Sequence, residues 1–159
     1  MTQANKIEIS DLASFLRLAN QRTYANKDAP QVQSTRLGSQ DYEFDDGDLR
    51  YHDTFFGDRD FIGEEIVYRR GKLFWGMNYF GFILADELKE TEVYDFLRIA
   101  LMQQNDDIIP VRGPASIAHG EWKYALSVTG DLTNFSGQEE ISLQERTVYR
   151  LSLHGGLLR

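Results

Sequence analysis

The sequence contains an internal repeat, and a repeat limits the folds open to a chain more than any other feature. Residues 10–19 and 91–100 align without a gap. The Gly-Asp, Phe-x-Gly and Glu-Glu-Ile motifs of residues 57–66 recur in the same order within residues 130–141. The offset between matching residues drifts only in small steps, as it would where short loops absorb insertions. Two α+β segments could also resemble each other by chance, but the ordered motifs favour a duplication.

Each repeat is expected to begin with a helix. Apolar residues at helical spacing predict helices over residues 10–22 and 91–104. An irregular stretch follows each helix, over residues 23–40 and 105–120, and these two stretches contain all three prolines. Each half is therefore expected to run from a helix through a loop into strands.

Three strands are expected after each loop, separated by turn residues. They span residues 48–56, 64–70 and 73–84 in the first half, and residues 121–129, 138–144 and 147–154 in the second. Residues 41–45 can add a short strand through the Asp46-Gly47 turn. Residues 73–84 are apolar on both faces, which predicts a central strand or one that joins the halves.

The predicted fold class is α+β, with two helix-plus-antiparallel-meander halves over residues 10–84 and 91–156. The chain has 159 residues, too few for two domains of ordinary size, so we expect a single domain over residues 1–159. Packing the halves about a pseudo-twofold axis is the simplest way to give them one core.

Charge and composition argue against several classes of protein. The net charge of −8 disfavours direct nucleic-acid binding, which needs clustered Lys and Arg. No apolar run is long enough for a membrane span, and the first 20 residues show no signal-peptide pattern, so we expect a cytoplasmic protein. There is no cysteine, no histidine pair at metal-binding spacing and no glycine-rich phosphate motif. We therefore predict no metal and no cofactor, and assign no catalytic residue.

Strand alternation gives the sharpest prediction about a site. Glu64 and Glu139 each share a strand face with the apolar residues two and four positions later, so both are expected to point inward. A buried carboxylate is costly unless it is paired. The available partners are Arg36 and Arg112, each in the irregular stretch of its own half. Three interpretations stay open: solvated strand ends, a structural latch, or a ligand-binding or catalytic role.

Aromatic residues concentrate on residues 73–84 and 121–129, where they form either core or the walls of a pocket between the halves. His154 precedes two glycines that let a ligand approach the backbone, whereas His52 is expected to be an exposed sheet residue. The acidic balance favours a neutral or cationic ligand. The candidate ligand-binding residues are Arg36, Glu64, Trp75, Asn78, Tyr79, Arg112, Trp122, Tyr124, Glu139 and His154.

Several motifs resemble a bacterial domain family of unknown function, over nearly the whole chain after about residue 10. They are Tyr24-Ala25, Arg36–Ser39, Asp53–Glu65, Trp75–Gly81, Arg112–Pro114, Phe135–Glu140 and His154–Gly156. In some relatives this domain follows an XRE-type helix-turn-helix. The resemblance implies a sensor or accessory domain and assigns no activity. The duplicated architecture is also similar to the GyrI-like effector-binding fold, which implies small-molecule binding between repeats.

We therefore expect a small-molecule-binding or regulatory domain rather than an enzyme. One alternative is an enzyme that uses an inward Glu64 or Glu139 with an arginine partner. Another is a protein-interaction domain or homodimer that uses an exposed sheet face. A binding domain predicts an aromatic cleft, an enzyme predicts convergent polar groups with shifted pKa values, and an interaction protein predicts an apolar surface patch.

Overall fold

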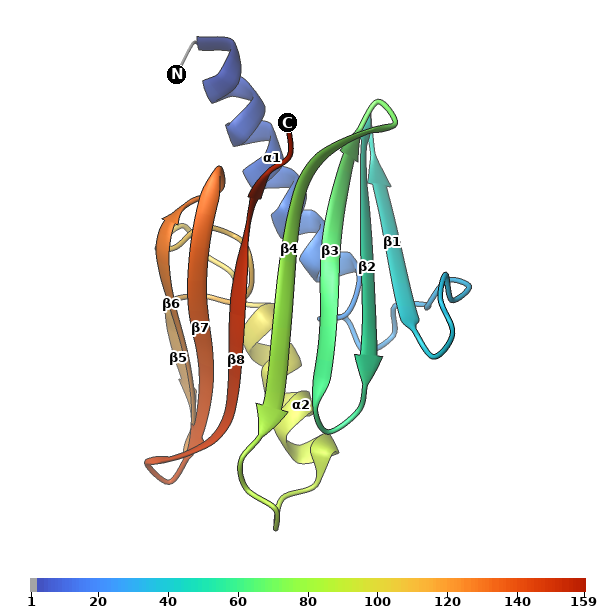
Figure 1. The fold of residues 1–159 in the computed structure, drawn as a ribbon. Coiled ribbons are helices and arrows are strands. Elements are labelled where there is room, and N and C mark those ends of the chain that lie inside the picture. The colour runs from blue at the N-terminus through green and yellow to red at the C-terminus, as the bar shows by residue number, and fades with distance from the viewer. Residues whose placement is uncertain (1–2) are drawn as a thin grey trace.

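Eight antiparallel strands form one sheet, and two helices lie behind it in the view of Figure 1. The computed structural model describes residues 3–159. Helix α1 spans Gln3–Arg22 and helix α2 spans Glu90–Leu101. The strands are β1 (Gln40–Asp46), β2 (Leu49–Gly57), β3 (Phe61–Arg69), β4 (Lys72–Ile83), β5 (Ser116–His119), β6 (Trp122–Asp131), β7 (Asn134–Leu143) and β8 (Arg146–Leu157).

The α+β fold class is confirmed, and each half consists of a helix followed by four strands. The strand order is β1-β2-β3-β4-β8-β7-β6-β5, which is symmetric about the β4–β8 pair. Strand β4 therefore joins the halves, as its two apolar faces predict. The prediction of three strands per half was wrong for the second half, because β5 lies inside the stretch of residues 105–120 expected to be irregular.

Both helices pack on the same face of the sheet, which we call the covered face. Their apolar stripes enter a single buried cluster that also contains side chains from both halves of the sheet. From α1 this cluster takes Leu12, Phe15, Leu16 and Ala19, and from α2 it takes Val93, Phe96, Leu97, Ala100 and Leu101. We call the opposite side, which carries no helix, the open face (Figure 1).

The strand register decides which side chains share a face. Asp53 on β2 lies opposite Glu65 on β3, which lies opposite Met77 on β4, and all three are buried on the covered face. The neighbouring row, which contains Thr54, Glu64, Asn78 and His154, therefore points to the open face, because successive side chains of a strand alternate.

Candidate functional site

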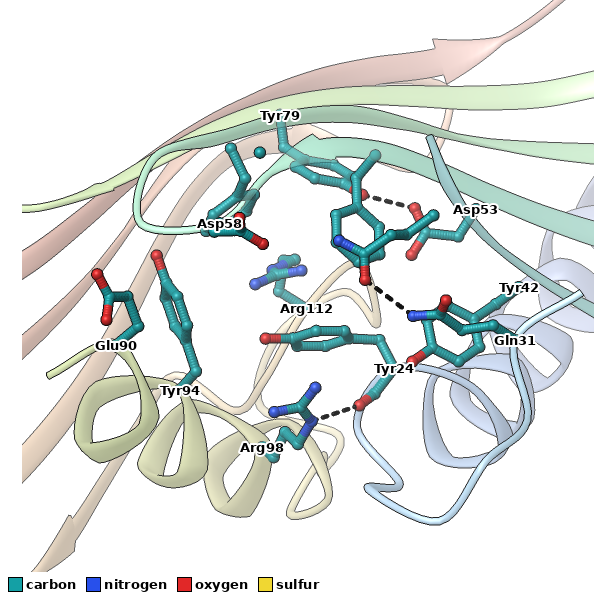
Figure 2. Close-up of a pocket in the computed structure, with 14 residues that line it drawn as sticks. Tyr24, Gln31, Tyr42, Asp53, Asp58, Tyr79, Glu90, Tyr94, Arg98 and Arg112 are labelled. Carbon is teal, nitrogen blue, oxygen red and sulfur yellow. Dashed lines mark hydrogen bonds between the residues drawn. The ribbon is translucent and has the colours of Figure 1, made fainter. Parts of the chain in front are cut away.

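A cavity of about 180 Å³ lies between the covered face of the first four strands and helix α2 (Figure 2). The loop after α1 closes one side of it. The residues that line it are Tyr24, Gln31, Gln40, Tyr42, Asp53, Phe55, Gly57, Asp58, Phe61, Tyr79, Glu90, Tyr94, Arg98 and Arg112. A dry cavity of about 150 Å³ is large enough for benzene, so this one fits a ring with one or two polar atoms attached.

Aromatic rings form most of the cavity wall. On one side the Tyr42 ring stacks on Phe55 with centroids 6.4 Å apart, and Tyr24 meets both rings edge-on. On the other side Phe61 meets Tyr94 edge-on at 5.7 Å. With Tyr79, six aromatic side chains surround a space of about one ring. This arrangement favours a flat or cationic ligand.

The deep end of the cavity is polar and buried. The Tyr79 hydroxyl donates to Asp53 Oδ1 over 2.5 Å. Gly63 makes this approach feasible, because a Cβ at that position would meet the Tyr79 hydroxyl oxygen at 2.5 Å. Burial raises the pKa of Asp53 to about 6, although the bond from Tyr79 and the charge of Arg112 lower it.

Glu65 lies directly across the sheet from Asp53 and faces the same interior. Its side chain is 3% exposed, and its Oε2 atom has no hydrogen-bond partner among the described residues. Burial, followed by the charge of Asp53, raises the pKa of Glu65 to about 8. The two opposed carboxyls therefore share their ionisation: a negative charge on one makes a negative charge on the other more costly.

Glu139 on β7 lies in a different environment. Arg112 Nε and Nη2 donate to its two oxygens over 3.0 and 2.8 Å. The hydroxyls of Tyr124 and Tyr149 add bonds of 2.6 and 2.9 Å. Burial alone would lower the pKa of Arg112, but the charge and hydrogen bonds of Glu139 raise it well above its usual value. Both oxygens of Glu139 are therefore fully bonded, and Arg112, which also lines the cavity, is held in this pair.

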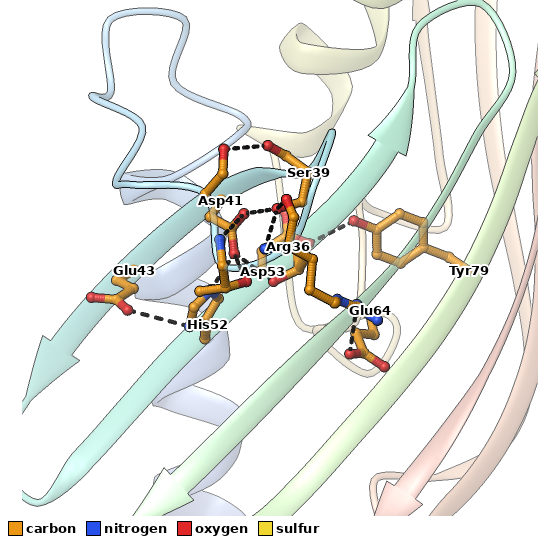
Figure 3. Close-up of polar contacts among 11 residues, drawn as sticks. Arg36, Ser39, Asp41, Glu43, His52, Asp53, Glu64 and Tyr79 are labelled. Carbon is orange, nitrogen blue, oxygen red and sulfur yellow. Dashed lines mark hydrogen bonds and ion pairs between the residues drawn. The ribbon is translucent and has the colours of Figure 1, made fainter.

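A second polar cluster lies on the open face, where the loop before β1 folds against the sheet (Figure 3). Asp41 is fully buried there and accepts bonds from Thr35, Ser39 and Thr54 of 2.6 to 2.7 Å. His52 Nε2 lies 2.6 Å from the same carboxylate. Burial would raise the pKa of Asp41, but these bonds outweigh it and hold the pKa well below its usual value. This cluster fixes the loop to the sheet.

The two predicted arginine–glutamate pairs both form, but on opposite faces. Arg112 and Glu139 are the buried pair of the covered face. Arg36 and Glu64 are 3.2 Å apart on the open face, with side chains 56% and 42% exposed. The inward orientation predicted for Glu64 was therefore wrong, and Glu65 is the buried residue. The prediction failed because the open face of β3 is also apolar, so Ile66 and Tyr68 did not mark the interior.

The prediction that Trp75, Trp122 and Tyr124 line an aromatic cleft between the halves was wrong, because each of them packs elsewhere. Trp75 is fully buried, stacks on Phe135 and donates its indole N–H to the Leu132 carbonyl. Trp122 packs on Phe96 of α2 instead, with ring centroids 5.4 Å apart.

Tyr124 belongs to the Glu139 cluster. Of the predicted aromatics, only Tyr79 lines the cavity, where it is joined by the predicted Arg112.

The remaining candidates gather on the open face. Asn78 and His154 lie side by side there, 3.3 Å apart between amide and ring nitrogens. Together with Arg36 and Glu64 they line a groove of about 620 Å³. His52, expected to be exposed, is instead largely covered by the loop contacts of Asp41, with a side chain 17% exposed.

The sequence did not indicate Asp53 or Glu65 as site residues, nor Tyr24 and Tyr94 as parts of the cavity wall. One signal for Glu65 was present in the repeat. The matches of Phe61 and Gly63 have an offset of 74 residues, and keeping that offset aligns Glu65 rather than Glu64 with Glu139. The contribution of α2 to the wall of the first half is a tertiary contact with no local signal.

The chain belongs to the DUF5680 family, a domain of unknown function, whose model matches residues 53–158. No curated protein and no solved structure matches the chain significantly. Within the described residues, no group of three or more His, Asp or Glu side chains is arranged to hold a metal ion. None of the described helices is long and apolar enough to cross a membrane.

Proposed function

We propose that this protein is a small-molecule-binding or regulatory domain, and that the aromatic cavity under α2 is its binding site. The observation that carries the proposal is the combination of six aromatic side chains with the buried carboxyl of Asp53 at one end, which lies opposite Glu65, whose Oε2 has no hydrogen-bond partner among the described residues. A cavity kept only for packing would be closed by side chains or lined by apolar groups. The ligand is a small neutral or cationic molecule. A bacterial origin and a link to helix-turn-helix regulators remain expectations of the sequence resemblance, and a cytoplasmic location remains an expectation of the sequence pattern.

A thermal-shift screen of small neutral and cationic metabolites tests the proposal. A ligand at about 100 times its dissociation constant adds about 2.7 kcal/mol of stability. Tyr24→Ala removes a ring from the cavity wall and should abolish the shift. The matched control is Tyr68→Ala, which removes a half-buried tyrosine from the open face and should leave the shift intact. Equal loss in both variants, or no shift with any compound, contradicts the proposal.

Catalysis at the same site is a second candidate, favoured by the raised pKa values of Asp53 and Glu65. Groups with strongly shifted pKa values gather at active sites as well as at binding sites. Incubating each hit with the protein and following it by NMR separates the two. A compound recovered unchanged supports binding alone, and its conversion, lost in Asp53→Asn, supports an enzyme.

The open face offers the interaction surface of the third candidate. Ile62 and Phe80 are 56% and 46% exposed on it, beside the groove that Phe56 also lines. A homodimer through this face predicts concentration-dependent sedimentation that Phe80→Asp abolishes. A monomer at all concentrations removes this candidate.

We also propose that the two halves arose by duplication. Bulges at Val67/Tyr68 and at Ile141/Ser142 have the same offset of 74 residues as the motif matches. Gly57, the last residue of β2, and Gly130, the last but one of β6, both have a φ of +97°. Superposing residues 10–83 on residues 91–156 tests the proposal, which requires the helices and at least three strands to overlay.

A further inference from the structure

The buried polar groups beside the cavity contain more acid than base. Asp53, Glu65 and Glu139 are three buried carboxyls on the covered face, and Arg112 is the one buried cation that the described residues place among them. Glu139 uses the Nε and Nη2 donors of Arg112 and two tyrosine hydroxyls. The other two carboxyls are therefore left without a cation of their own.

The hydrogen bonds show the same deficit. Within the described part of the chain, Asp53 accepts one side-chain bond, from Tyr79, and Glu65 Oε2 accepts none. Both side chains are more than nine-tenths buried. Buried acceptors normally have donors, so Glu65 Oε2 lacks a donor, and Asp53 can accept further N–H or O–H groups beside the Tyr79 hydroxyl.

The wall and the mouth of the cavity suit a positive guest. Tyr24 and Tyr42 line the cavity on the side of Asp53, and Tyr94 lies on the opposite side next to Glu90 (Figure 2). Aromatic faces attract cations. The charged residues that line the cavity are the acids Asp53, Asp58 and Glu90 and the bases Arg98 and Arg112, of which Arg112 is paired with Glu139. The Arg98 guanidinium is engaged with Tyr24, stacked 4.2 Å from its ring and bonded to its carbonyl.

We infer that the cavity binds a small organic cation, a protonated amine or amidine on a flat apolar body, whose N–H groups bond to the carboxyl of Asp53. This inference rests on the proposed function and specifies the ligand class of that site. Glu65, across the sheet from Asp53, stays protonated beside the bound cation and keeps the site close to neutral. The aromatic walls hold the apolar body and exclude water.

Binding is therefore expected to release protons. Near pH 6 Asp53 is partly protonated and an arriving cation displaces its proton, whereas Glu65 keeps its own. The other titratable or charged groups that face this pair are Tyr24 from the loop after α1, Tyr51 from β2, Tyr79 from β4, Glu139 from β7, Arg112 from the loop after α2, and His52 and Asp41 from the open face. The tyrosines have pKa values raised by burial, so they do not titrate in this range.

Three probes of one shape and different charge test the inference: benzylammonium, benzyl alcohol and benzoate. Calorimetry at pH 7 on the full chain should show benzylammonium binding about tenfold to hundredfold more tightly than benzyl alcohol, and benzoate most weakly. Asp53→Asn should remove the preference for the cation and change the affinity for benzyl alcohol by less than about twofold. Asp45→Asn, which neutralises an exposed carboxylate of β1 that pairs with Arg50 outside the cavity, is the matched control and should keep the preference.

A second measurement does not depend on any variant. Calorimetry at pH 6 in buffers of different ionisation enthalpy should show proton release with benzylammonium and none with benzyl alcohol. Equal affinity for the two, a preference for benzoate, or a preference that survives Asp53→Asn overturns the inference and leaves the proposed binding site standing. If none of the three probes binds to the wild-type chain, the proposed site fails as well.

Discussion

Glu65 and Glu139 lie in the third strand of their halves, both on the covered face, yet their surroundings differ. Glu139 receives two bonds from Arg112 and one each from Tyr124 and Tyr149. Glu65 lies opposite another carboxyl, Asp53, and has an oxygen without a partner. One half has built a closed ion pair, and the other has kept an open acidic site beside a cavity.

The loops after the two helices explain the difference. The loop after α2 stays on the covered face and places Arg112 against Glu139. The loop after α1 contributes Tyr24 to the cavity and then crosses to the open face, where Asp41 anchors it and Arg36 pairs with Glu64. Arg36 therefore pairs with Glu64 at the surface, and the buried carboxyls Asp53 and Glu65 have no arginine of their own.

Removing Glu139 should have the largest effect. Glu139→Ala leaves the Arg112 guanidinium buried without its partner, which costs about 3–5 kcal/mol of unfolding free energy in urea titrations. The control is Glu140→Ala on the same strand, whose pair with Arg150 is about 40% exposed. That pair should contribute less than about 1 kcal/mol. Equal costs for the two variants would mean that the buried pair is not the closed unit described.

Replacing Glu65 by glutamine, which cannot ionise, should change the pH dependence of the unfolding free energy. The pKa of Glu65 in the folded state is about 8, above its ordinary value of 4.5, so the folded state holds the proton more tightly and stability falls as pH rises between these values. Glu65→Gln should flatten this slope and exceed the wild type by a few kcal/mol above pH 8. Glu64→Gln, the exposed neighbour, should keep the wild-type slope. A wild-type stability that is constant from pH 5 to 8 would refute the assignment.

Weakening the loop anchor should have an intermediate effect. The pKa of Asp41 is lowered, so its contribution to stability is present above its ordinary value of 3.8 and is lost as pH falls below that value. Asp41→Asn should cost about 2 kcal/mol at pH 7 and speed hydrogen exchange over residues 33–39. Asp45→Asn, in an exposed pair with Arg50, is the control and should do neither. Unchanged exchange in Asp41→Asn would show that other contacts hold the loop.

The smallest effect is expected at Glu64, because its pair with Arg36 is solvated. Glu64→Ala should change stability by less than about 1 kcal/mol, measured in the same urea titrations. A loss of about 3 kcal/mol, as the inward orientation expected from the sequence required, would mean that the Arg36 loop is a structural latch after all.

Helices, most strands and the central place of β4 could be predicted because their apolar spacing is local. β5 could not, because Ser116–His119 is short and mostly exposed, so it lacks a buried face to set a pattern. The orientation of β3 was predicted wrongly because both of its faces carry apolar side chains. A shift of one residue exchanges the two faces of a strand. The pairing of Arg112 with Glu139 was correct because a buried carboxylate needs a cation.

The cavity could not be predicted from the sequence. Its wall combines Tyr24 from the loop after α1 with Tyr94 and Arg98 from α2, and no local pattern shows that α2 of the second half packs over strands of the first. The sequence shows which strands are rich in aromatic residues, but whether a ring such as Trp75 fills the core or lines a pocket depends on tertiary packing.

The central claim is that Glu65 is a protonated carboxyl at neutral pH beside a site for a cation. Carbon-13 NMR of glutamate-labelled protein, with the Glu65 side-chain signal assigned through Glu65→Gln, measures this directly. We expect that signal to titrate near pH 8 and to shift when benzylammonium is added. Titration at the ordinary value near 4.5, with no response to the amine, would contradict the account.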